Sequence, residues 1–296
     1  MALANLQDYQ QPSDLKAAIA FKQQWGDRAL IVAGGTFVHG LAARGLLNDI
    51  EAVLDISRVG LDRIELRRDG ISIGATATYG ALAAHRVVRD EGRFGALADA
   101  LSYPPPQILN VATVGGCLAS SCPLFDLPVA AAALGGVIVA TSTAGETRHD
   151  ISGFFTGLFE SSLSENEVVT SIELSVDQNV VSGFSKLETN ANDLALVNAA
   201  VSLTFKKGLF DRRAKCVEAR AWVGGGVGET ICHLPTVEAK LGSGAELTEE
   251  FIAEAVAAAA TDVTAAGDHR ASARYRQKML EVQLKIAIER ALERQV

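Results

Sequence analysis

Two pairs of adjacent glycines are the residues of this sequence best suited to hold a ligand. Gly34-Gly35 follows the apolar stretch Ile31–Ala33, and Gly115-Gly116 follows Asn110–Val114. Glycine adopts positive φ without strain and has no Cβ to keep a ligand off the backbone. Successive N–H groups in such a turn can form a concave nest for phosphate oxygens. Two nests in one domain suit a pyrophosphate, although each pair alone is also compatible with a simple tight turn.

A carboxylate that follows the second pair could complete such a site. Asp126 leads Leu127-Pro128 into an expected helix. Its carboxylate could accept hydrogen bonds from the hydroxyl groups of a ribose or a ribityl chain. The ordinary alternative for an aspartate in this position is the N-cap of the helix.

The glycine patterns differ from the common nucleotide-binding motifs. Gly34-Gly35 lacks the spacing of the Rossmann fingerprint, and the sequence contains no Gly-Lys-Ser/Thr of a P-loop. The run Gly224–Gly228 has no helix-opening context and is interpreted as a flexible connection. Histidines and cysteines show no metal-ligand spacing, so we expect no metal site, and we expect Cys117 and Cys122 to be buried free thiols.

Composition restricts the class of protein. The 296 residues suit one large or two medium domains, and the hydrophobic content of 48% supplies a core. A net charge of -8 with scattered Lys and Arg disfavours nucleic-acid binding, which needs a clustered basic surface. The longest apolar stretch, Leu127–Ala140, is broken by Pro128 and Gly135-Gly136 and is too short to span a membrane. We therefore expect a cytoplasmic protein.

The first half reads as mixed α and β structure. Ser13 is the expected N-cap of a helix that ends near Trp25, and apolar strands are expected at 29–33 and 53–56. Asp69-Gly70 indicates a hairpin between 64–66 and 71–73. Helices are expected at 79–89, 95–101 and 126–134, and strands at 137–141 and 168–175. The spacing of the strands is too irregular to predict a simple βαβ repeat.

The pattern of expected strands and helices changes near residue 178. After it, 183–187, 196–206 and 216–223 read as antiparallel strands, followed by helices at 248–260 and from 270 to the C-terminus. The fold class expected is therefore α+β in two domains, 1–177 and 178–296.

Several short motifs resemble those of the FAD-binding subunits of molybdenum hydroxylases, a family that includes the medium subunit of carbon monoxide dehydrogenase and the flavin domain of xanthine dehydrogenase. In the first domain they are Ala33–Thr36, Thr113–Gly116 and Pro123–Pro128. In the second domain they are Phe184–Lys186, Asn192–Ala195 and Asp268–Arg276. The resemblance covers nearly the whole chain.

The resemblance implies a two-subdomain FAD-binding fold of the vanillyl-alcohol oxidase (PCMH) type, with subdomains at about 1–58 and 59–177, followed by a smaller α+β C-terminal domain. It implies non-covalent FAD, since His39 does not have the spacing of a covalently attached residue. No side chain of this chain is expected to be catalytic. The implied FAD contacts are Ile31, Val32, Ala33, Gly34, Gly35, Thr36, Phe37, Val38, Tyr103, Ala112, Thr113, Val114, Gly115, Gly116, Asp126, Val169 and Lys186. By pattern alone, a surface lysine on a strand is the favoured interpretation of Lys186.

The resemblance also implies partners. Electrons would pass from a molybdenum–pterin cofactor on a large subunit, through a small [2Fe-2S] subunit, to this FAD and then to an external acceptor, in a dimer of heterotrimers. An N-heteroaromatic substrate is the first choice, with carbon monoxide, aldehydes and purines open. Leu109, Cys117 and Leu194 stand where many members have Arg, Asn and an aromatic residue; the last difference leaves the oxidant open. The alternatives are a self-contained flavoprotein oxidase or reductase and a non-enzymatic assembly module.

Overall fold

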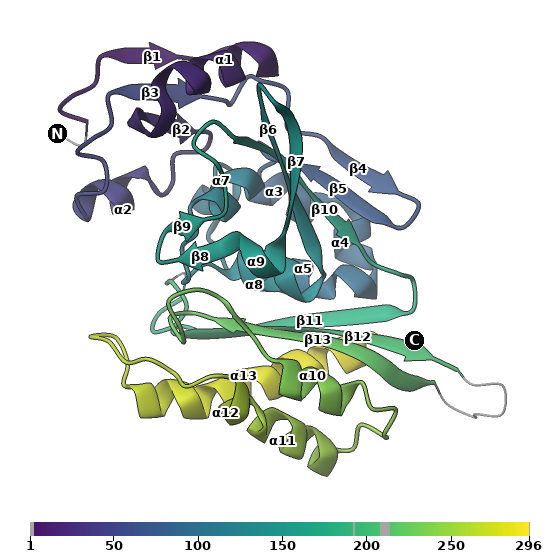
Figure 1. The fold of residues 1–296 in the computed structure, drawn as a ribbon. Coiled ribbons are helices and arrows are strands. Elements are labelled where there is room, and N and C mark those ends of the chain that lie inside the picture. The colour runs from purple at the N-terminus through teal and green to yellow at the C-terminus, as the bar shows by residue number, and fades with distance from the viewer. Residues whose placement is uncertain (1–2, 192, 208–213, 296) are drawn as a thin grey trace.

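The chain forms three main sheets that follow one another through the molecule, each with helices packed on it (Figure 1). The computed structural model describes residues 3–191, 193–207 and 214–295, except for the side chain of His39. Asn192, which belongs to one of the quoted motifs, lies outside these residues.

The N-terminal sheet has three parallel strands in the order β1-β3-β2. Its strands are β1 (Asp8–Gln10), β2 (Ala29–Val32) and β3 (Ala52–Asp55), and helices α1 (Leu15–Trp25) and α2 (Val38–Ala43) connect them. The expectation of no simple βαβ repeat is wrong here, because β1 is too short to show a pattern in the sequence. The N-cap prediction is also wrong by one residue: Asp14, not Ser13, accepts the Ala17 N–H at 2.9 Å.

The central sheet is antiparallel, with the order β4-β5-β10-β6-β7. The predicted hairpin is confirmed as β4–β5, but the predicted helix 79–89 is broken at His85, whose ψ of 124° is extended. The strands are β4 (Ile64–Arg67), β5 (Gly70–Gly74), β6 (Gly136–Ser142), β7 (Gly145–Asp150) and β10 (Val168–Ser175), with β8 (Phe155–Gly157) and β9 (Glu160–Ser161) as a separate pair. The helices are α3 (Tyr79–Ala84), α4 (Arg86–Asp90), α5 (Gly95–Ala100), α6 (Pro106–Leu109), α7 (Val114–Ala119), α8 (Asp126–Ala133) and α9 (Ile151–Phe154), with 3₁₀ turns at Gly26–Arg28 and Gly92–Phe94.

The C-terminal sheet is antiparallel, with the order β11-β12-β13-β14, as the strand pattern predicts for its three long members. The strands are β11 (Val180–Leu187), β12 (Val197–Lys206), β13 (Lys215–Gly224) and β14 (Cys232–His233). The helices are α10 (Pro235–Leu241), α11 (Glu249–Ala257), α12 (Ala259–Asp262) and α13 (Ala273–Glu293).

Both faces of the C-terminal sheet are covered, and this positions side chains for the site. Helix α13 packs on β11 and β12 from one side, while α5 and α8 pack on them from the other (Figure 1). Successive side chains of a strand point to opposite faces. On β12, Val201 belongs to the core under α13, whereas its neighbour Ala200 belongs to the core of the central sheet. The two halves therefore share a core, and the boundary near residue 178 stays a prediction.

No helix in the described part of the chain has both the length and the apolar composition that crossing a bilayer requires.

Candidate functional site

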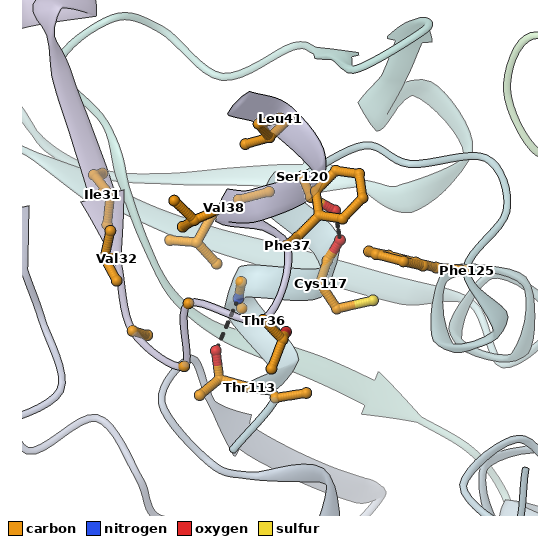
Figure 2. A pocket seen from close by; sticks show the side chains of 18 of the residues that line it. Ile31, Val32, Thr36, Phe37, Val38, Leu41, Thr113, Cys117, Ser120 and Phe125 are labelled. Carbon is orange, nitrogen blue, oxygen red and sulfur yellow. Dashed lines mark hydrogen bonds between the residues drawn. The ribbon is translucent and has the colours of Figure 1, made fainter. Parts of the chain in front are cut away.

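A large cavity lies where the N-terminal sheet, the central sheet and the C-terminal sheet meet. Its volume is about 950 Å³, and its lining comes from β2, the turn before α2, helices α7 and α8, β10 and β11. Figure 2 shows Ile31 and Val32 at the left of the view and Cys117 and Phe125 at the right, with Thr36 and Thr113 between them. The volume lies near the upper end of the range for small-molecule and cofactor sites, roughly 300–1,000 Å³.

The first glycine turn lines this cavity and has unpaired backbone donors. Gly35 has φ of +66°, which an L side chain rarely adopts, and a Cβ on Gly34 would collide with the carbonyl oxygen of Val111. In the described part of the chain, the amides of the four residues 34–37 have no protein acceptor. Unpaired amides that line a cavity are suited to anionic oxygens. The positive φ of Gly35 and the unpaired amides are the features that the predicted backbone nest requires.

The second glycine turn has a different role from the one predicted. It begins α7, and its amides are already used: Gly115 donates to Ala75 O at 2.8 Å and Val114 to Ala77 O at 3.0 Å. Gly116 donates to Thr113 Oγ1 at 3.3 Å (Figure 2). The prediction of a second nest of free amides is therefore wrong for Val114–Gly116. The reason is a tertiary contact, since Gly115 lets α7 lie directly on the backbone of Ala75.

Gly115→Ala is therefore expected to lower the free energy of unfolding by about 1–3 kcal/mol, the usual cost of overpacking. A Cβ at this position would lie 2.5 Å from the Ala75 Cβ and 2.8 Å from its Cα. Urea unfolding of the protein without added flavin measures the loss. Gly153→Ala is the control, because its Cβ would have no atom within 4 Å. Equal stability of both variants would contradict the packing role.

A buried charged cluster closes one end of the cavity. The Lys186 ammonium lies 3.1 Å from Asp126 Oδ2 and 3.0 Å from Glu188 Oε2, and only 4% of its side chain is exposed. Asn198 Nδ2 donates to Asp126 Oδ1 at 2.8 Å. Burial raises the pKa of Asp126 above its ordinary value, while Lys186 and Asn198 oppose the rise. The alternative of a surface lysine is wrong for Lys186.

Asp126 is not the N-cap of α8 either. Phe125 occupies that position, and Asp126 is the first helical residue, with its carboxylate directed to Lys186 and Asn198. A carboxylate held in this way keeps acceptor capacity that a capping carboxylate would have used on the helix amides.

Of the residues implied by the resemblance, the cavity is lined by all except Tyr103 and Val114. Val114 is buried in the core of the central sheet. Tyr103 lies beside Lys186: its hydroxyl accepts the Lys186 backbone N–H at 3.3 Å, and its ring centroid lies 5.3 Å from the Lys186 Nζ. The assignment of these residues to FAD contacts remains a prediction.

Several lining residues were missed in the sequence. The aromatic residues Tyr79, Phe125 and Phe159 line the cavity, with Phe37 packed edge-on to Phe125 at 5.0 Å between ring centroids. Lys22 and Arg44 add cations. Of these residues, only Lys22 could have been recognised in the sequence, as a lysine within the apolar face of the expected helix. Its Nζ donates to Gly26 O at 2.6 Å, and burial lowers its pKa.

The cysteines are thiols, as predicted for Cys117 and Cys122. All four are free, and Cys117 and Cys122 are buried. Burial raises the pKa of Cys117 and raises that of Cys122 to about 11, so both are protonated near neutral pH. Protonated thiols are neither nucleophiles nor metal ligands.

Two family models match this chain. Residues 4–176 match the FAD binding domain in molybdopterin dehydrogenase, and residues 182–291 match the CO dehydrogenase flavoprotein C-terminal domain. The first match alone covers more than half of the 296 residues.

Full-length relatives agree with these matches. The chain is 28% identical to the carbon monoxide dehydrogenase medium chain of Afipia carboxidovorans, covering 97% of each chain. It is 26% identical to the nicotine 6-hydroxylase medium subunit of Paenarthrobacter nicotinovorans, covering 92% of this chain and 93% of that one. A chain in the crystal structure of the cyanide-inactivated Cu,Mo-CO dehydrogenase superposes with a TM-score of 0.89 at 27% identity, covering 99% of this chain and 100% of that one. The chain therefore belongs to the family of FAD-binding medium subunits of the molybdenum hydroxylases.

Proposed function

We propose that this chain binds one FAD non-covalently in the cavity and acts as the electron-transfer subunit of a heterotrimeric molybdenum hydroxylase. The single observation that carries the proposal is the turn at residues 34–37, whose four residues line a cavity of about 950 Å³ and whose amides, in the described part of the chain, have no protein acceptor. The pyrophosphate of FAD supplies the anionic oxygens that such amides bind.

The remaining lining fits the rest of the cofactor. Asp126 is held by Lys186 and Asn198 with acceptor capacity left for a hydroxyl group of the FAD chain. The apolar and aromatic side chains, among them Val169, Tyr79 and Phe125, suit flat rings. At the second glycine turn the backbone can lie close to the cofactor, because Gly116 and Thr113 line the cavity. The amide of Gly116 is not free for the cofactor, since it donates to Thr113.

The chain's own residues bind and orient rather than react. Bound flavin accepts electrons singly and releases them in a pair, which suits a position between a one-electron iron–sulfur cluster and a two-electron acceptor. The buried ammonium of Lys186 is already paired with Asp126 and Glu188, so its role is to fix the Asp126 carboxylate at the end of the cavity. At this end of the cavity only 4% of the Lys186 side chain and 12% of the Asp126 side chain are exposed.

We propose a small [2Fe-2S] subunit and a large molybdenum–pterin subunit as partners, in a dimer of heterotrimers in the cytoplasm. Symmetric assembly is the general expectation for soluble oligomers. An N-heteroaromatic substrate on the large subunit is our first choice, supported by the relative named for nicotine hydroxylation. The domains proposed are residues 1–177 and 178–296.

Purification of the affinity-tagged chain from its native cells tests the proposal. We expect one FAD per chain, released by denaturation with no flavin left on the polypeptide, together with two co-purifying subunits that contain iron and molybdenum. Turnover assays with an N-heteroaromatic compound, carbon monoxide, an aldehyde and a purine then identify the substrate class. Turnover by the isolated chain would favour a self-contained oxidase, and a chain without flavin would favour an assembly module.

A further inference from the structure

One arginine of the C-terminal domain holds a segment of the cavity wall by three hydrogen bonds. Arg270 lies in the turn before α13, and its guanidinium reaches residues 193–195, which we call the wall segment. Nη1 donates to Ala195 O at 3.0 Å, and Nη2 donates to Leu194 O at 2.6 Å and to Asp193 Oδ2 at 3.3 Å. A planar guanidinium can make all three bonds at once, whereas the single ammonium of a lysine cannot reproduce this geometry.

The wall segment lies between β11 and β12 and faces the cavity. Asp193 and Leu194 line it, while Lys186 lies near the end of β11 on the same side. Asp193 and Leu194 are partly exposed, whereas Ala195 is buried. The backbone bonds around the segment are few: Asp193 N donates to Asn190 O at 3.1 Å, and Leu196 N donates to Leu187 O at 2.8 Å.

The side chain of Asp268 holds the turn that carries Arg270. Asp268 Oδ1 accepts the amides of Arg270 at 2.8 Å and Ala271 at 3.1 Å. Its other oxygen pairs at 2.8 Å with Arg276, whose side chain is 1% exposed. Arg276 also donates to Ala266 O at 3.1 Å. The motif Asp268–Arg276 therefore connects the core of the C-terminal domain to the wall of the cavity.

We propose that Arg270 is a positioning residue that holds the wall segment against the cavity and thereby limits the access of solvent and of external oxidants to the bound flavin. The proposal rests on the proposed function only in that FAD must occupy the cavity. It assigns to the C-terminal domain a share in the reactivity of the flavin, since three bonds from one side chain determine where the wall lies.

The test compares Arg270→Gln with Arg274→Gln in the FAD-loaded protein. Both variants remove one positive charge from the same turn and helix start, but Arg274 is exposed and, in the part of the chain that the structure describes, forms no ion pair. We expect Arg270→Gln to release FAD about tenfold faster, equivalent to about 1.4 kcal/mol. We also expect iodide to quench its bound-flavin fluorescence severalfold more efficiently. Arg274→Gln should behave as the wild type in both measurements.

Arg270→Lys keeps the charge and is the variant to use if the glutamine variant does not fold. We expect it to increase quenching as well, but by less than Arg270→Gln. Quenching and release rates that equal those of the wild type in a folded, FAD-loaded Arg270 variant would overturn the positioning role. A wild-type chain that binds no FAD would instead overturn the proposed function, so the two failures are distinguishable.

Discussion

Gly35→Val is expected to weaken FAD binding by about a hundredfold or more while leaving the fold intact. A Cβ at position 35 would meet only Val32 Cγ1 at 3.7 Å, which is an ordinary contact, so the substitution fits sterically. The strain comes from the backbone, because φ of +66° is a genuine outlier for a β-branched residue. Such strain amounts to about 1–3 kcal/mol and is relieved when the turn changes its dihedral angles.

The change in dihedral angles that relieves the strain is expected to weaken FAD binding. Residues 34–37 line the cavity with unpaired amides, and a turn that leaves the left-handed conformation at Gly35 redirects these amides. A hydrogen bond to a charged group contributes about 1.5–3 kcal/mol, so misdirecting two amides costs at least about a hundredfold in the dissociation constant. Fluorescence titration of the flavin-free protein with FAD measures the change.

Gly60→Val is the matched control. Gly60 has φ of +80°, a Cβ there would meet no atom within 4 Å, and the residue does not line the cavity. It should lose stability by a similar amount and still bind FAD like the wild type. If Gly35→Val also binds FAD normally, the turn at 34–37 is not the pyrophosphate site.

The contrast between the two glycine turns shows what the sequence alone could predict. At the first turn an apolar strand leads into Gly34-Gly35, and the positive φ of Gly35 is a local feature, although Gly34 is also required by the distant Val111. The second turn looks the same in the sequence, but Gly115 is required by Ala75, forty residues earlier. No local pattern encodes that contact, so the role of its amides was predicted wrongly.

The charged cluster shows a second limit. A lysine in a strand gives no sign of burial, and the sequence pattern alone favours a surface position for Lys186. Its position follows from the two-residue period of the strands once both faces of the C-terminal sheet are covered. The same period on β12 places Asn198 on the side of α8, where it meets Asp126. The resemblance indicated Asp126 and Lys186 as ligand contacts, but only the tertiary structure pairs them.

Lys186→Met is expected to destabilise the protein by about 3–5 kcal/mol near neutral pH, the usual result of leaving a buried charge without its partner. The lysine is the one cation that the structure places within ion-pair distance of both Asp126 and Glu188, among the residues it describes. Its removal leaves two carboxylates near one another in a buried region. Lys278→Met, on the exposed side of α13, is the control and should change the stability little.

The pH dependence separates this electrostatic loss from lost packing. Burial already raises the pKa of Asp126 above its ordinary value of 3.8, and Lys186 opposes that rise, so the variant has a still higher pKa. An acid with a raised pKa in the folded state binds more protons there than in the unfolded chain, so its stability increases as the pH falls through that interval. The deficit of Lys186→Met relative to the wild type should therefore shrink as the pH is lowered from neutral towards 4, as measured by urea unfolding at a series of pH values.

Removing the Asp126 charge as well should restore part of the stability. In Lys186→Met/Asp126→Asn, one of the two buried negative charges is gone and the amide introduced at position 126 needs no proton to be neutral, so much of the lost stability should return at neutral pH and the pH dependence should flatten. Coupling of this kind is expected between groups in direct contact, here 3.1 Å apart. A deficit that is independent of pH, or additive losses in the double variant, would show that Lys186 acts through its methylene chain and not through its charge.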